Sequence, residues 1–147
     1  MFRKFILTFC LMLGLTVTGV YGKQPPIYAE DGVAINGYDP VAYIETISAQ
    51  EGSNEFTHEW MGAIWKFTSQ ENLDRFVASP EDYAPQYGGY CAYAVAKGHT
   101  ATTVPDAFTI HHGKLYLNYS KRVERIWRQN MNNFIVKGDE NWPGVLN

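Results

Sequence analysis

Cysteine is scarce in this chain of 147 residues, which contains only Cys10 and Cys91. Cys10 lies inside an apolar run near the N-terminus, so only Cys91 remains if that run is removed from the protein. A single cysteine cannot form an internal disulfide bond, which excludes a small scaffold held together by disulfides. Cys91 is then either a buried small apolar residue or a free thiol with a chemical role.

The chain also lacks an apolar run of the length expected for a membrane-spanning helix. The run from Phe5 to Val20 is shorter than the roughly 20 residues of a spanning helix, and Arg3 and Lys4 precede it. Val20 and Gly22 are small residues at the positions three before and one before a cut that a signal peptidase recognises. We therefore predict a secretory signal peptide over residues 1–22, cleaved after Gly22, with a retained membrane anchor as the alternative. The processed protein would be periplasmic or secreted, without a stable membrane span.

Clustered positive charge is missing as well. The formal net charge is −3, and loss of Arg3 and Lys4 with the leader would lower it to about −5. Binding to nucleic acid requires clustered basic residues that neutralise phosphates, so we exclude a nucleic-acid partner. One short basic group contains Glu124, and we interpret it as the solvated face of a helix. Its members are Lys121, Arg122, Arg125 and Arg128.

The composition suits one globular domain. With 46% hydrophobic and 18% charged residues, the chain has enough apolar material for one core and is too short for two ordinary domains. Residues 23–32 contain Pro25-Pro26 and no clear period, so we expect an extended lead-in there. The ordered domain is then expected to begin near Val33 and to cover residues 33–147.

Alternating patterns predict two hairpins in this domain. Residues 55–67 alternate around a Met61-Gly62 turn, and residues 108–119 alternate around a His112-Gly113 turn. In the second hairpin we expect the side chains of His111 and His112 to point to opposite sides. The strands predict a small antiparallel sheet.

Helical patterns lie between and after the hairpins. Residues 70–78 predict a helix capped by Ser69, and Ser79 is expected to cap a second short turn that begins at Pro80. Ser120 is expected to cap one closing helix, with Trp127 on its buried face, that extends to about Lys137. Residues 92–96 fit either a helical turn or a buried strand. Short helices that cover a small antiparallel sheet give a single-domain α+β fold.

One set of residues resembles a known family, the YHS domain, in order and in spacing. Those residues are Asp39-Pro40-Val41, Trp60, Gly62, Trp65, Phe67, Ser69, Phe76, Pro80 and Tyr83. Further blocks extend the resemblance to the longer secreted YHS domain-containing proteins over nearly the whole processed chain. These blocks are G-Y-D-P-V-A-Y, Y-G-G-Y-C-A-Y-A-V, G-K-L-Y-L-N-Y and N-W-P.

The resemblance implies a metal-associated domain, because the family is thought to bind metal, copper among the candidates, through its cysteines. In this chain the three matching positions hold Ala42, Thr68 and Asn72. None of these side chains offers the soft thiolate that copper or zinc favours. The resemblance therefore predicts the family framework without the family ligands.

A different set of ligands is one hypothesis for this chain. Cys91, His58 and His99 are soft or borderline donors of the kind that suits copper or zinc. Each also has an ordinary structural interpretation, since no spacing typical of a metal site joins them. Cys91 also follows the glycine pair Gly88-Gly89, with Tyr90 between them. The pair predicts an unusual backbone conformation or a close approach of two segments.

We expect a binding module outside the cytoplasm that recognises a metal ion, a small ligand or an envelope protein. The alternative is a structural or protein-interaction domain without metal. A thiol enzyme would use Cys91 as nucleophile and His99 as base. The apolar neighbours of Cys91 are expected to raise the pKa of its thiol, and the sequence contains no catalytic motif, so we do not expect an enzyme.

Overall fold

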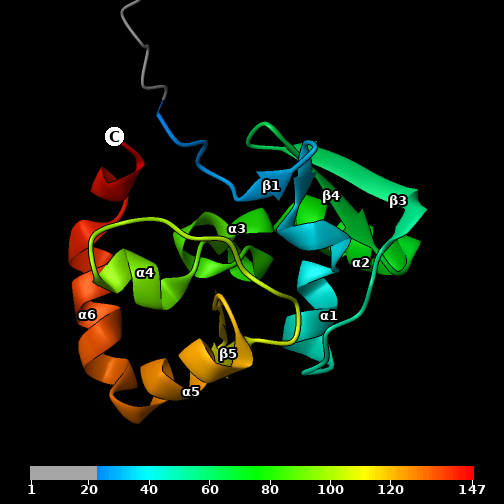
Figure 1. The fold of residues 1–147 in the computed structure, drawn as a ribbon. Helices are drawn as coiled ribbons and strands as arrows, with labels where there is room; N and C mark the ends of the chain where they lie inside the picture. Colours follow the sequence, from blue (N-terminus) through cyan, green and yellow to red (C-terminus); the bar gives the residue numbers. More distant parts are fainter. Residues whose placement is uncertain (1–22) are drawn as a thin grey trace, which may run out of the picture.

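A four-stranded sheet forms one side of the computed structural model, which describes residues 23–147 (Figure 1). Its strand order is β1 (Ala29–Glu30), β2 (Val33–Ala34), β4 (Ala63–Phe67) and β3 (Ser53–Trp60). Neighbouring strands are antiparallel except β2 and β4, which run parallel where Val33 lies opposite Ile64. The predicted signal peptide, residues 1–22, lies outside the described residues.

A separate two-stranded sheet consists of β5 (Phe108–His111) and β6 (Lys114–Leu117). Both predicted hairpins are therefore confirmed. Each closes with a two-residue turn in which both residues have positive φ: 49° and 77° for Met61-Gly62, and 49° and 73° for His112-Gly113. Such turns match the twist of the strands, and glycine adopts this conformation without steric cost.

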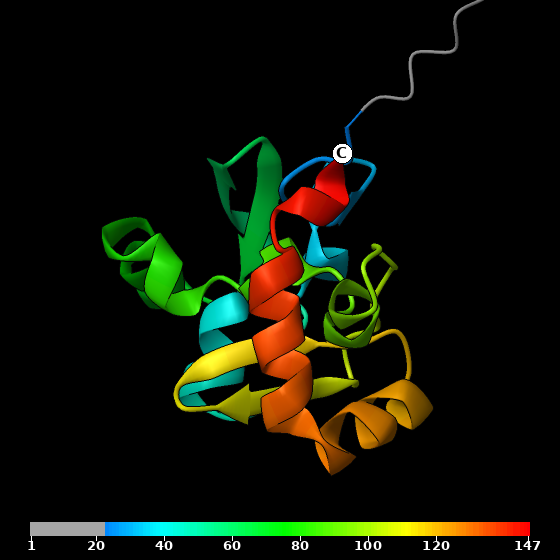
Figure 2. The same ribbon diagram turned by 90° about the vertical axis from the view of Figure 1, so that its left-hand side faces the viewer.

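Helices cover both sheets. In Figure 1, α4, α5 and α6 lie together on the side away from β3, and Figure 2 shows α6 running past α4. The helices are α1 (Pro40–Glu45), α2 (Gln70–Ala78), α3 (Pro80–Tyr83), α4 (Ala92–Ala96), α5 (Lys121–Gln129) and α6 (Met131–Asn141). Short 3-10 turns are η1 (Ile35–Gly37), η2 (Gln86–Gly89) and η3 (Gly144–Leu146). The described residues form one α+β domain, as predicted.

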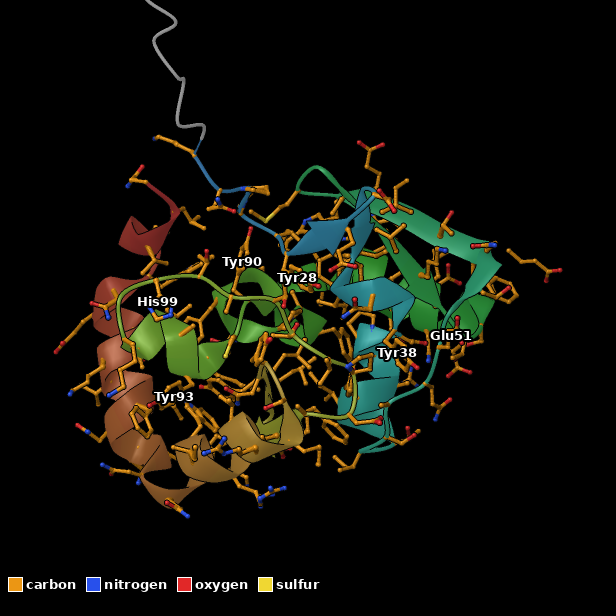
Figure 3. All side chains as sticks on the ribbon, in the orientation of Figure 1. Tyr28, Tyr38, Glu51, Tyr90, Tyr93 and His99 are labelled. Carbon is orange, nitrogen blue, oxygen red and sulfur yellow. The ribbon has the colours of Figure 1, made fainter. Side chains whose placement is uncertain are left out.

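Two neighbouring apolar clusters form the core. The first joins the four-stranded sheet to α1 and α2 and contains the fully buried residues Trp65, Phe67 and Phe76. The second lies between η2, α4 and the two C-terminal helices, and it is rich in aromatic rings such as Tyr87 and Trp127. Figure 3 labels two of its rings, Tyr28 and Tyr90, whose centroids are 5.8 Å apart.

The predicted helix over residues 70–78 is confirmed. The Ser69 hydroxyl accepts a hydrogen bond from the Asn72 backbone N–H at 3.1 Å, as an N-cap should. The following turn also forms, but the Ser79 side chain makes no capping hydrogen bond. Residues 92–96 adopt the helical alternative, as α4.

The prediction of one closing helix is wrong. The chain breaks at Asn130, where φ is −141°, and continues as α6 through Gly138. Gly138 is buried against Tyr87, and a Cβ at this position would lie 2.5 Å from the Tyr87 Oη. The basic residues of α5 are exposed as predicted, but Glu124 is buried and pairs with Lys121 at 2.9 Å.

Two further expectations need correction. The rings of His111 and His112 do not diverge, because the positive φ of His112 brings them edge to face with centroids 4.0 Å apart. The ordered fold also begins before Val33, since Ile27 and Tyr28 are buried and β1 follows them. No helix within residues 23–147 is long and apolar enough to cross a membrane.

Candidate functional site

The three positions at which the resemblance places cysteines gather around one buried carboxylate. Asp39 caps α1, because it precedes Pro40, whose missing N–H and preset φ suit the first position of a helix. Its Oδ1 accepts hydrogen bonds from the backbone N–H groups of Val41 at 2.8 Å and Ala42 at 3.1 Å. Ala42, the first of the three positions, thus binds this carboxylate through its backbone N–H.

The other two positions bind the second oxygen of Asp39. Its Oδ2 accepts hydrogen bonds from the Thr68 N–H at 2.8 Å, the Thr68 hydroxyl at 2.9 Å and the Asn72 Nδ2 at 2.8 Å. The side chain of Asp39 is fully buried. Five donors therefore hold α1, the end of β4 and the start of α2 to one another, without a thiolate.

A metal ion bound in the way that the resemblance implies does not fit these residues. The methyl group of Ala42 has no donor atom, and the Thr68 hydroxyl and the Asn72 amide are hard, neutral groups. Both oxygens of Asp39 already accept hydrogen bonds. This carboxylate network connects the elements by hydrogen bonds where thiolates would connect them through a metal.

Cys91 is buried between the start of α4 and the end of β6. Its thiol donates to the Asn118 Oδ1 at 3.5 Å, and its Sγ accepts a hydrogen bond from the Tyr119 backbone N–H at 3.3 Å. Burial raises the pKa of the Cys91 thiol, although nearby backbone N–H groups partly oppose the effect. A raised pKa lowers the fraction of thiolate, which is the reactive form. The hydrogen-bond partners of the thiol, the Asn118 amide and the Tyr119 N–H, are not groups that would act as a base.

The other two candidate ligands lie elsewhere. His58 is half-buried on β3, where its ring packs against Phe76 with centroids 6.4 Å apart. His99 is exposed in the loop after α4, and Figure 3 shows it on the opposite side of the view from Glu51, which precedes β3. Within residues 23–147, no three histidine, cysteine, aspartate or glutamate side chains are grouped so that they could hold a metal ion. The structure does not bring Cys91, His58 and His99 together.

One concavity of the described residues is a groove of about 590 Å³ that we call the aromatic groove. This volume is within the roughly 300–1,000 Å³ range of ligand pockets. Four segments line it: the lead-in, the β3–β4 turn, the stretch from α3 to η2, and the C-terminal end. Figure 2 shows the β3–β4 hairpin and η3 at the same end of the molecule. The residues that define its character are Trp60, Met61, Glu81, Tyr87, Asp139 and Trp142.

Two of the seven residues other than glycine that have positive φ within residues 23–147 line the aromatic groove. Met61 and Tyr87 both line it with positive φ, 49° and 57°, a conformation that residues other than glycine rarely adopt. Next to Tyr87, Gly88 has a φ of 62°, and a Cβ there would lie 1.9 Å from the carbonyl oxygen of Pro26. The glycine pair thus allows the close approach that the sequence predicts, and the approach holds the lead-in against η2.

The charged side chains that line the aromatic groove are both acidic. Its charged lining residues are Glu81 and Asp139. The Tyr87 hydroxyl donates to the Asp139 Oδ1 at 2.9 Å. Burial, followed by this hydrogen bond to Asp139, raises the pKa of Tyr87 well above its ordinary value. Tyr87 therefore stays protonated at neutral pH and at moderately alkaline pH, and it keeps donating to Asp139.

The sequence analysis identified neither the carboxylate network around Asp39 nor the aromatic groove. A signal for the carboxylate network was present, because an aspartate directly before a proline at the start of a helix is a capping pattern. The aromatic groove has no such local signal, since its walls come from segments far apart in the chain. The one hint was Met61, an apolar residue at a turn position where asparagine, aspartate or glycine is preferred.

Comparisons with known proteins identify no relative. No family model matches the chain, no curated protein matches it, and no solved structure resembles it significantly. The functional argument therefore depends on the geometry of the chain itself.

Proposed function

We propose that this protein is a binding module of the YHS type, exported from the cytoplasm, that holds a small organic ligand in the aromatic groove. The observation that carries the proposal is the groove itself, which has the volume of a ligand pocket and is lined by aromatic side chains from separate segments. The family resemblance and the signal-like leader support the class and the location.

The conformation of Met61 favours a binding role for the groove. Its side chain is 50% exposed, although it is large and apolar. The positive φ of this residue adds a conformational cost that asparagine or glycine would avoid. An exposed apolar side chain at a strained position is unfavourable for the isolated fold, and contact with a ligand would offset that cost.

Binding of the neutral dye Prodan to the purified protein tests this proposal. We expect saturable binding with one dye per chain, detected by dye fluorescence. The Met61→Asn substitution should weaken it at least about fivefold, because it removes an apolar wall of the groove. Asparagine is favoured in this type of turn, so the variant should fold at least as well as the parent.

The matched control is Ile64→Thr, which changes a residue that is 42% exposed on β4 and does not line the groove. This variant should bind the dye like the parent. The proposal is wrong if the dye does not saturate the protein, or if Met61→Asn and Ile64→Thr bind it equally well.

A further inference from the structure

We infer that the ligand of the aromatic groove is an organic cation, a protonated amine attached to an apolar body. This inference rests on the proposed function and adds the chemical class of the ligand. It comes from two features of the groove, the sign of its charged residues and the kind of rings beside them.

The charged side chains of the groove are two carboxylates that form no ion pair within residues 23–147. Asp139 also borders a neighbouring hollow lined by His111, His112 and Lys114, but it pairs with none of them. Glu81 and Asp139 line it, and no lysine, arginine or histidine is among its lining residues. Ion pairs elsewhere in residues 23–147 engage Glu45, Glu71 and Glu124, but neither of the two groove carboxylates. A cationic ligand would supply the missing charge.

The rings beside these carboxylates suit a cation as well. Trp60 and Trp142 are half-buried at the groove, and the Trp142 ring lies 6.1 Å from the Tyr87 ring, centroid to centroid. The face of an indole attracts an ammonium group because the ring carries negative charge density on its faces. Aromatic rings and carboxylates that line the same groove therefore favour an ammonium head, and the apolar part of the groove suits a hydrocarbon body.

The orientation of Asp139 is set by the protein itself. Its Oδ1 accepts the Tyr87 hydroxyl, and Tyr87 is held in place by its burial and its packing in the second core cluster. A carboxylate that is oriented in advance loses less conformational freedom when it pairs with a ligand. Asp139 is thus the better positioned of the two groups to meet an ammonium ion.

Three probes of nearly the same shape test the inference by calorimetry at neutral pH: phenylbutylamine, phenylbutanol and phenylbutyrate, which are a cation, a neutral molecule and an anion. We expect the amine to bind about tenfold or more tightly than the alcohol. The anion should bind most weakly, because it would face two like charges.

Two double variants distinguish the effect of the groove carboxylates on binding from the effect of the net charge of the protein. Glu81→Gln with Asp139→Asn should remove most of the preference for the amine and leave only the smaller contribution of the aromatic rings, and the asparagine keeps an oxygen for the Tyr87 hydroxyl. Asp82→Asn with Glu140→Gln removes the same total charge from neighbouring exposed positions that do not line the groove. This control should keep the preference for the amine.

Each outcome decides one of the two proposals. If all three probes bind equally, or the anion binds best, the groove is a ligand site but the inference about its charge is wrong. A preference for the amine that is undiminished in Glu81→Gln with Asp139→Asn also overturns the inference. If none of the probes binds while the dye still saturates the protein, only the inference fails; if the dye does not bind either, the proposed function fails together with it.

Discussion

Replacing Asp39 by asparagine tests the role of the buried carboxylate network. The two side chains have the same shape, so the change alters hydrogen bonding and charge while leaving the volume unchanged. The amide oxygen of asparagine can still accept from the backbone N–H groups at the start of α1. Its NH₂ group would then face the Thr68 N–H and the Asn72 Nδ2, which are both donors.

The expected loss of stability follows from these two donors. A buried donor that loses its acceptor costs about 1–3 kcal/mol. Thr68 and Asn72 are half-buried, so water can partly compensate, and we expect a total loss of about 3 kcal/mol for Asp39→Asn. The Thr68→Val substitution removes the hydroxyl, which donates to the Asp39 Oδ2 and accepts from the Asn72 Nδ2 at 3.2 Å, and keeps the N–H, so it should cost about 1 kcal/mol.

Urea unfolding followed by tryptophan fluorescence measures both values, since Trp65 is buried in the same core cluster as Phe67, next to the network. The control is Asp74→Asn, an exposed position on α2, which should change stability by less than about 0.5 kcal/mol. Asp39→Asn should also lower the melting temperature by roughly 10 °C. A loss below about 1 kcal/mol for Asp39→Asn would refute the view that this carboxylate holds the three elements together.

Three further predictions concern buried groups. Burial raises the pKa of Tyr28 to about 12, and unfolded tyrosine loses its proton first, at about pH 10. Stability should therefore be full below about pH 10 and fall as the pH rises towards 12, and a flat profile in urea unfolding would contradict this. Cys91 should react with iodoacetamide about 100-fold more slowly in the native protein than in urea, as measured by mass spectrometry, and rapid native labelling would reopen the thiol-enzyme hypothesis. Gly138→Ala should destabilise the protein by about 1–3 kcal/mol in thermal unfolding, because the new methyl group would meet the buried Tyr87 ring. Gly144→Ala, which meets nothing within 4 Å, should be nearly neutral, and equal effects of the two substitutions would refute this explanation.

Local patterns predicted the elements whose cause is local. The helix over residues 70–78 follows from one capping serine and an apolar stripe, and the hairpins follow from alternation around glycine turns. The break at Asn130 was missed, because the apolar period of α5 continues past it. The long α6 was also missed, since Gly138 normally signals the end of a helix, and only the Tyr87 ring explains a glycine inside this one.

The sequence alone determined the α+β class, the order of the central elements and the absence of thiolates at the three positions around Asp39. Tertiary structure decided which distant residues meet. It brought Ala42, Thr68 and Asn72 to one carboxylate, separated Cys91 from His58, and assembled the aromatic groove from four segments. The physical reason is that capping and periodicity act over a few residues, whereas a buried network or a groove depends on how complete elements pack.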